Sequence, residues 1–390
     1  MQLEATCIPH RSMLSRALLL GLTLQLASPR SARAEDRLEY KWQDYAEDDG
    51  RIRVKSHYLF AQKEINTFTT ARFQGVVDAI AGATPTGVPA DEDSGELPLS
   101  DLVEEREAGA FSLEYRPGET ILGFEYARSD EDDYLSNSYT IRYSRYLNKR
   151  NTTLRTAYSF IDDDITPPAI DPQKKESHEF LFGIAQLLDP KTTLSIDLTY
   201  SDIDGYLTDP YKQVLKDIEI VNGLTLPLIF AERRPEKRER YIFQTNAKRY
   251  FDTLDASLDA TYRFFDDNWD IESHTLDLAW YQKLGEKWTL RPHLRYYRQS
   301  AAEFYSPDLN QTDIIPESSP GPDTPFYSSD YRLSSLSSLT YGLKAIYQLS
   351  EWATLDLNFE RYDMSGEDEL TSPQAYPDAS IFTVGVSISK

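Results

Sequence analysis

The sequence has 390 residues, with 41 Lys and Arg against 64 Asp and Glu, and a formal net charge of −23 at pH 7. Such an acidic balance disfavours nucleic acid as a partner, because phosphates are bound by patches of lysine and arginine. The single cysteine is Cys7. If an N-terminal leader is removed, no disulfide, thiolate metal site or cysteine nucleophile is expected.

The first 34 residues have the pattern of a secretory leader. Arg11 and Arg16 precede an apolar run at 17–26, and Ala-Arg-Ala at 32–34 fits the small-x-small cleavage signal. We expect cleavage after Ala34, whether translation starts at the first or the second methionine, which leaves a mature chain of 35–390. Cleavage would remove four arginines and one glutamate, so the net charge would change from −23 to −26.

Alternation with a period of two residues dominates the rest of the chain. In 254–264 every second residue is apolar, and the residues between them are polar or charged. Similar segments occur at 194–200, 339–344, 355–360 and 382–389. This pattern is typical of strands with one apolar and one polar face. No run of 18 or more apolar residues follows the leader, and the mean hydropathy is −0.54. A form that spans a membrane would therefore be a barrel.

The connections between these strands alternate in length. Short ones are rich in Gly, Pro, Asn and Asp, as at 117–118, 148–150 and 189–191. Long, acidic connections are expected at 78–104, 162–177, 204–236, 301–329 and 364–378. Short turns on one side and long loops on the other are typical of a bacterial outer-membrane barrel.

The number of strands tests this interpretation, because single-chain barrels of this class have an even number. From Gly50 onward the pattern contains fifteen strands, and Leu38, Tyr40 and Trp42 supply one more. We therefore predict an all-β fold for 35–390, a transmembrane antiparallel up-and-down β-barrel of about sixteen strands. A soluble sandwich or a β-solenoid would also alternate, but no linker composition and no fixed repeat is visible.

Several separate strings, in the same order along the chain, resemble the family known as domain of unknown function 3570. They are DAIAGATPTG (78–87), DPKTT (189–193), SHTLDLAWYQ (273–282), LRPHLRYYRQS (290–300), SDYRL (329–333) and SLTYGL (338–343). The resemblance covers nearly all of the mature chain and implies a Gram-negative outer-membrane barrel. It implies no established activity, substrate or catalytic residue. Proteins of this family also resemble components that are encoded near enzymes that attach flavin. This resemblance suggests a redox partner for the barrel.

A barrel of about sixteen strands leaves an aqueous channel unless something fills it. On the predicted register, charged side chains of both signs face the interior. The pore-lining candidates are Arg142, Arg155, Arg263, Arg291, Arg295, Arg332, Asp197, Asp259, Asp277, Asp356 and Glu360, with Arg240, Lys344, Glu114, Glu125 and Asp255 as further members. These residues predict either a constriction with a transverse electric field or a mesh of ion pairs inside a filled barrel.

Other patterns point to sites less specifically. The 78–104 loop either folds inward and narrows the pore or is a solvated surface loop. The acidic runs at 130–133 and 162–164 lack the spacing of a calcium loop, so a solvated charge run is the better interpretation. His274 beside Ser273, or His293 near a serine, suggests a hydrolase pair only loosely. We therefore predict no enzyme activity and no catalytic, cofactor or metal site.

The expected function is a channel or transport-associated barrel for small polar solutes. The alternative is a non-conducting barrel that anchors a periplasmic or surface partner, which could be a redox protein. The expected partners are the lipid bilayer and the outer-membrane assembly machinery. That machinery commonly reads a terminal aromatic residue, whereas this sequence finishes with Ile388, Ser389 and Lys390. Recognition would have to use Phe382 and the alternating apolar residues, or tolerate the final polar pair. The oligomeric state is not indicated.

Overall fold

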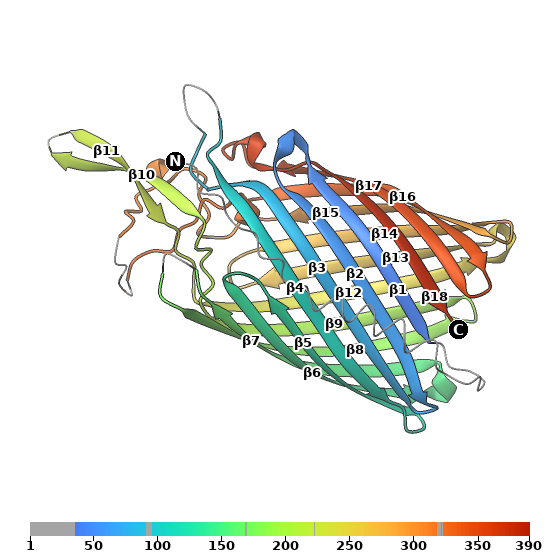
Figure 1. The fold of residues 1–390 in the computed structure, drawn as a ribbon. Helices are drawn as coiled ribbons and strands as arrows, with labels where there is room; N and C mark the ends of the chain where they lie inside the picture. The colour runs from blue at the N-terminus through green and yellow to red at the C-terminus, as the bar shows by residue number, and fades with distance from the viewer. Residues whose placement is uncertain (1–35, 91–95, 168–169, 222, 318–320, 322) are drawn as a thin grey trace, which may run out of the picture.

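The computed structural model describes residues 36–390 apart from 91–95, 168–169, 222, 318–320 and 322. The predicted leader, its cleavage site after Ala34 and Cys7 lie outside the described residues. The described part is built almost entirely of strands joined by turns and loops (Figure 1). No helix in it is long and apolar enough to cross a bilayer.

In the described part of the chain, sixteen strands form a closed barrel. They are β1 (Arg37–Glu47), β2 (Arg53–Asn66), β3 (Thr69–Pro85), β4 (Leu99–Tyr115), β5 (Thr120–Asp130), β6 (Tyr134–Leu147), β7 (Thr152–Ile165), β8 (Gln173–Asp189), β9 (Thr192–Gly205), β12 (Lys237–Phe251), β13 (Ala256–Asp267), β14 (Glu272–Leu284), β15 (Trp288–Gln299), β16 (Leu336–Ser350), β17 (Ala353–Gly366) and β18 (Ala379–Ser389).

Each barrel strand pairs antiparallel with the next, and β1 closes the barrel against β18, from Arg37 opposite Ser389 to Glu47 opposite Ala379. The strand β1, which contains Leu38, Tyr40 and Trp42, is the sixteenth strand that parity required. Closure leaves no open sheet edge, as a bilayer demands, because unpaired backbone groups cannot be hydrated in lipid. The predicted barrel of about sixteen strands is confirmed.

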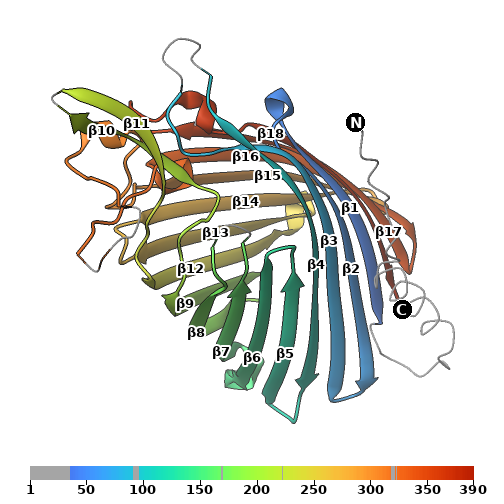
Figure 2. The same ribbon diagram turned by 60° about the vertical axis from the view of Figure 1, so that its left-hand side comes forward.

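Among the described residues, two further strands form a separate hairpin, and six short 3-10 helices lie in the connections. The hairpin consists of β10 (Gln213–Val221) and β11 (Leu224–Ala231), which pair only with each other, so that β9 lies beside β12. Figures 1 and 2 show this hairpin projecting from one end of the barrel. The 3-10 helices are η1 (Asp48–Gly50), η2 (Asn148–Arg150), η3 (Asp252–Leu254), η4 (Leu309–Gln311), η5 (Tyr331–Leu333) and η6 (Pro373–Ala375).

The two faces of the wall differ in chemistry because successive side chains point to opposite faces. Large apolar side chains are exposed on one face, among them Ile141, Phe182 and Phe359 at 61%, 57% and 55% of their full accessible area. An exposed apolar belt of this kind is what contact with lipid requires. Their polar neighbours in sequence therefore face the interior.

The long connections lie at one end of the barrel, and the C-terminus lies at the other (Figure 1). Their bounds differ from the predicted ones. They span 86–98, 166–172, 206–236, 300–335 and 367–378. The largest difference is at 78–104, where β3 and β4 continue as paired strands to Pro85 and from Leu99. Acidic residues suggested a loop there, but a strand that has left the bilayer needs no apolar face.

Pro292 lies within β15, where its missing N–H removes a ladder donor. The β14–β15 pairing is interrupted there, between Ala279 opposite His293 and Gln282 opposite Leu290. The proline is therefore accommodated by a local gap in the ladder, and the register resumes unchanged on either side.

Candidate functional site

Ten of the eleven pore-lining candidates share the inner face. The register connects them across neighbouring strands, as in Arg155, Gly183 and Asp197 on β7, β8 and β9. Every one of the ten alternates with residues of the exposed apolar belt. Whether they line a conducting pore stays a prediction.

On the wall formed by β5–β9, the arginines are paired with carboxylates. Arg142 donates to both oxygens of Glu125, at 3.1 and 2.8 Å. Arg155 donates to both oxygens of Asp197, at 2.7 and 2.6 Å, and reaches across β8 to do so. Gly183 makes this possible, since a Cβ there would collide with Asp197 and lie 2.7 Å from Arg155 Nε. This wall matches the mesh of ion pairs.

On the wall formed by β14–β17, His293 joins two of the candidate carboxylates. One ring nitrogen lies 3.1 Å from Asp277 and the other 2.7 Å from Glu360. Gly342 separates His293 from Glu360 in the register, and again a side chain there would collide with the carboxylate side chain. His293 therefore holds both acids at once.

The remaining acidic candidates on the strands also have ion-pair or hydrogen-bond partners. Asp356 lies 3.1 Å from Lys344 Nζ, and Asp259 accepts from Asn246 Nδ2 at 2.6 Å and lies 3.1 Å from Lys248 Nζ. Glu114 pairs with Arg72 at 2.9 Å.

Four arginines on β12–β15 behave differently. Arg240, Arg263, Arg291 and Arg295 have no carboxylate within 4 Å among the residues that the structure describes. Arg263 and Arg291 instead lie over the rings of Phe265 and Tyr281, each 5.5 Å from the ring centre. The basic and acidic groups of the inner face are thus not evenly mixed: one wall is neutralised, and the other carries unpaired positive charge.

Two candidates do not lie on strands. Arg332 belongs to η5 in the 300–335 connection, because Asp330 caps that turn by accepting from Arg332 N at 3.1 Å, and β16 starts only at Leu336. Asp255 follows η3 in the left-handed conformation, with φ of 44°. Both were assigned to the inner face by extending an alternation that local turn formation interrupts.

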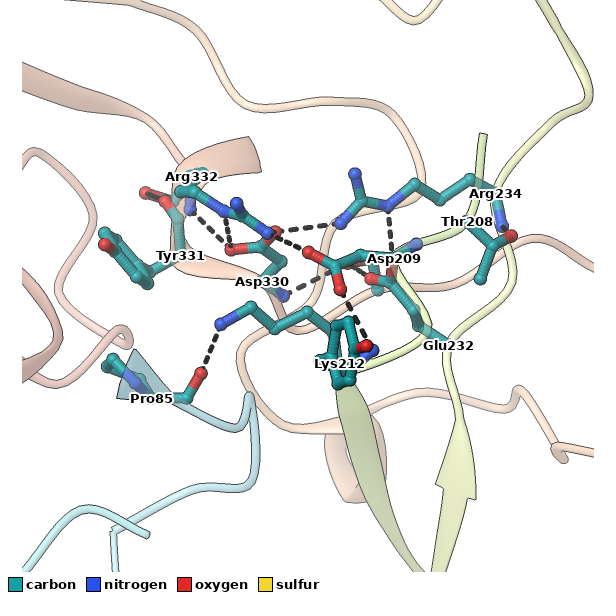
Figure 3. Close-up of polar contacts among 12 residues, drawn as sticks. Pro85, Thr208, Asp209, Lys212, Glu232, Arg234, Asp330, Tyr331 and Arg332 are labelled. Carbon is teal, nitrogen blue, oxygen red and sulfur yellow. Dashed lines mark hydrogen bonds and ion pairs between the residues drawn. The ribbon is translucent and has the colours of Figure 1, made fainter. Parts of the chain in front are cut away.

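Arg332 instead belongs to a group of charged side chains that connects two long loops (Figure 3). We call it the loop cluster: Asp209, Lys212, Glu232, Arg234, Asp330 and Arg332. Arg332 Nε donates to both oxygens of Asp330, at 2.9 and 2.8 Å, and its Nη2 pairs with Asp209. Arg234 joins Glu232 at 2.6 Å and Asp330 at 2.8 Å.

Burial and pairing shift the pKa values of these loop groups. Burial alone would raise the pKa of Asp330, but the nearby Arg332 and Arg234 outweigh it and lower that pKa to about 2. Burial raises the pKa of Glu232, against the opposing effect of Arg234, and lowers that of Lys212. Asp330 is therefore the anionic centre of the cluster.

The loop cluster is anchored to a third connection and to an apolar core. Lys212 Nζ donates to Pro85 O, and Gln213 N donates to Thr86 O at 2.8 Å. Lys216 Nζ donates to the carbonyls of Leu309 and Thr312, both at 2.7 Å. Val214, Leu309 and Tyr327 form a buried apolar group beneath these contacts. The 86–98, 206–236 and 300–335 connections are thus interlocked.

The family of the chain can now be stated. The model of the family described as protein of unknown function (DUF3570) matches residues 13–174 and 168–382. The chain belongs to this family. A comparison with curated proteins gives no match.

This DUF3570 protein resembles several solved structures, two of which are described as outer-membrane proteins. A ferric enterobactin receptor variant from Pseudomonas aeruginosa is 12% identical, with 91% of this chain and 60% of the receptor covered and a TM-score of 0.45. A loop-deletion variant of OmpT from Vibrio cholerae is 11% identical, with 92% and 99% covered and a TM-score of 0.45. A bacterial polysaccharide outer membrane secretin is 5% identical, with 91% and 98% covered and a TM-score of 0.49. The chain spans about 60% of the receptor's length.

The residues considered for hydrolysis lie apart in this DUF3570 protein. Ser273 and His274 are neighbours on β14 and therefore point to opposite faces. His274 Nδ1 lies 2.7 Å from the hydroxyl of Tyr262, and His293 contacts the two carboxylates described above.

The acidic runs are partly neutralised by neighbouring cations. Asp130 pairs with Arg128 at 2.8 Å, Asp163 with Lys175 at 2.9 Å, and Asp164 with Lys174 at 3.3 Å. In the part of the chain that the structure describes, no group of three or more His, Cys, Asp or Glu has the arrangement of a metal site.

Sequence reasoning missed five of the six members of the loop cluster. Only Arg332 was singled out, and it was placed on the inner face of a strand, whereas it lies in η5. The available signals were the SDYRL string at 329–333 and the paired arginines 233–234 within an acidic connection. Neither pattern indicates that residues about a hundred positions apart meet.

Proposed function

We propose that this protein is a channel or transport-associated barrel of the outer membrane for small polar solutes. The observation that carries the proposal is the contrast between the two faces of the closed wall, with a charged inner face opposite an exposed apolar belt. A polar interior enclosed by sixteen strands is wide enough to hold water. Export through a leader at 1–34, insertion by the outer-membrane assembly machinery and residence in the bilayer belong to the same proposal.

The interior carries hollows that are consistent with a passage. One of about 520 Å³ lies against the inner face of β1–β6, where the side chains are small, as in Ala108, Ala127 and Ser136. A second, of about 430 Å³, is lined by Arg142, Arg155 and Asp197, among others. Hydrated walls with charged groups suit polar solutes better than apolar ones.

The second candidate is a non-conducting barrel that anchors a periplasmic or surface partner, with a redox protein as one option. The interlocked loops favour it, because a folded group at the barrel end restricts entry and offers a fixed surface. A cavity of about 1050 Å³ lies among these loops, lined in part by Tyr206, Phe230 and Tyr327.

Planar-bilayer conductance of the purified barrel separates the two candidates. We expect stepwise currents in KCl, with larger or more frequent steps when residues 213–231 are replaced by a short Gly-Ser linker. Absence of current from both proteins at every salt concentration would exclude the channel and favour the anchor. Current from the loop variant alone would indicate a channel that the loops close.

A further inference from the structure

The unpaired arginines of β12–β15 share the inner face on neighbouring strands, and we call them the arginine lane: Arg240, Arg263, Arg291 and Arg295. Arg263 lies opposite Thr275, which in turn lies opposite Tyr297, two residues from Arg295. On the other side of β13, Arg263 lies opposite Gln244, four residues from Arg240 on the same face of β12. Arg291 precedes Arg295 by two double steps on the same face of β15, with His293 between them.

Carboxylates lie near the lane, but each is held by another cation or donor. Asp277 is directly opposite Arg295, yet its carboxylate contacts His293 at 3.1 Å. Asp267 is directly opposite Arg240, yet it accepts from Arg238 at 2.7 Å and is buried. Among the described residues, no lane arginine therefore has a carboxylate within 4 Å, although the register places two acids directly opposite lane members.

Several guanidinium groups held close together repel one another unless an anion lies among them. Arg240 Nε and Arg291 Nε are buried and have no hydrogen-bond partner among the described residues. On the β5–β9 wall, by contrast, Arg142 and Arg155 each have both carboxylate oxygens of an acid. Among the described arginines of the barrel strands, the buried Nε atoms without a partner are thus those on β12 and β15.

We propose that the arginine lane binds the oxyanion groups of permeating solutes and so makes anions the preferred substrates of the barrel. The planar guanidinium matches a carboxylate or phosphate with two parallel hydrogen bonds, which suits it to this class of ligand. This inference rests on the proposed channel function and names its substrate class. The acidic long loops and the basic lane would then lie in series along the passage.

The test is equilibrium binding of inorganic pyrophosphate to the purified full-length mature barrel in detergent, by isothermal titration calorimetry at low salt. Binding by the wild type is expected to weaken by at least about tenfold in the double variant Arg263→Gln with Arg295→Gln, because two charge-assisted contacts are lost. The control is Lys149→Gln with Arg150→Gln, which removes the same charge from the η2 turn and is expected to change affinity by less than about twofold. Heat-modifiable migration in gels verifies folding of each protein.

Equal affinities in all three proteins, or no binding by the wild type, would overturn the proposal that the arginine lane binds oxyanions. Titration with citrate in place of pyrophosphate shows whether carboxylates bind as well as phosphates. Bilayer recordings on the same preparations keep the two proposals distinguishable. Current without binding would retain the channel and refute the lane, whereas binding without current would retain the lane as an anion site and refute the channel.

Discussion

Single residues decide which charges on the inner face meet. Gly183 and Gly342 each occupy an inward position between two partners on the flanking strands, and the absence of a side chain lets Arg155 reach Asp197 and His293 reach Glu360. A glycine normally weakens a strand, because it adds no packing. Here it allows an ion pair to span two strand spacings, a role that becomes visible only when the register is known.

Asp330 is the residue on which the loop cluster depends most. It is 1% exposed and accepts from both Arg332 and Arg234. Asp330→Asn removes the anion and leaves two cations together, so we expect the cluster to be destabilised by about 3 kcal/mol, at the low end for breaking a buried pair because Arg332 is half exposed. Limited proteolysis should cut 206–236 and 300–335 faster, while the barrel stays heat-modifiable.

The matched control for this variant is Asp217→Asn, which changes the same side-chain chemistry at an exposed position in β10. Its cleavage pattern is expected to equal that of the wild type. Equal protease resistance of Asp330→Asn and the wild type would show that the ion pairs do not hold the loops together.

At the scale of elements, barrel and loops are joined in different ways. Barrel strands are fixed by ladders on both sides, whereas β10 and β11 pair only with each other. They contact the rest through Gln213, Lys216 and the apolar group of Val214, Leu309 and Tyr327, and residues of the loop cluster flank them in the sequence. The two systems should therefore be energetically separable.

Replacing residues 213–231 by a short Gly-Ser linker tests this separation. We expect the barrel to fold and to keep its resistance to SDS, because no barrel ladder is lost. The 300–335 connection should become sensitive to protease, because the variant lacks Lys216 and Val214, which hold it. Failure of the shortened protein to form a heat-modifiable barrel would contradict the independence of barrel and hairpin.

For the whole molecule, the arrangement of the connections predicts the orientation in the membrane. Long loops face outward in barrels of this class, so residue 220 in the hairpin should be outside and residue 149 in the η2 turn should be periplasmic. If the leader with Cys7 is cleaved, single cysteines can be placed without background. In intact cells a membrane-impermeant maleimide should label Ile220→Cys and not Lys149→Cys.

Permeabilised cells supply the control for this experiment, since both positions are exposed and should react once the outer membrane is opened. Labelling of Lys149→Cys in intact cells with protection of Ile220→Cys would show the opposite orientation.

The sequence alone determined the architecture. A strand in contact with lipid needs an apolar residue at every second position, and this period is visible in the sequence without knowledge of tertiary contacts. Alternation located the strands, and the requirement for an even number of strands added the one at Leu38–Trp42. The same alternation placed ten of the eleven pore-lining candidates on one face. The ends of the strands were less predictable, because beyond the bilayer a strand may be charged on both faces, as at 78–104.

Only the tertiary structure decided which charges are paired. Ion pairs between β7 and β9, or between Asp209 and Arg332, depend on the register, on glycine gaps and on loops that meet across 123 positions. The alternation of the sequence placed both Arg155 and Arg263 on the inner face. Asp197 neutralises Arg155, whereas Arg263 has no acid partner among the described residues. A one-dimensional pattern reports the face of a side chain, whereas electrostatics depends on distances of a few ångströms between strands.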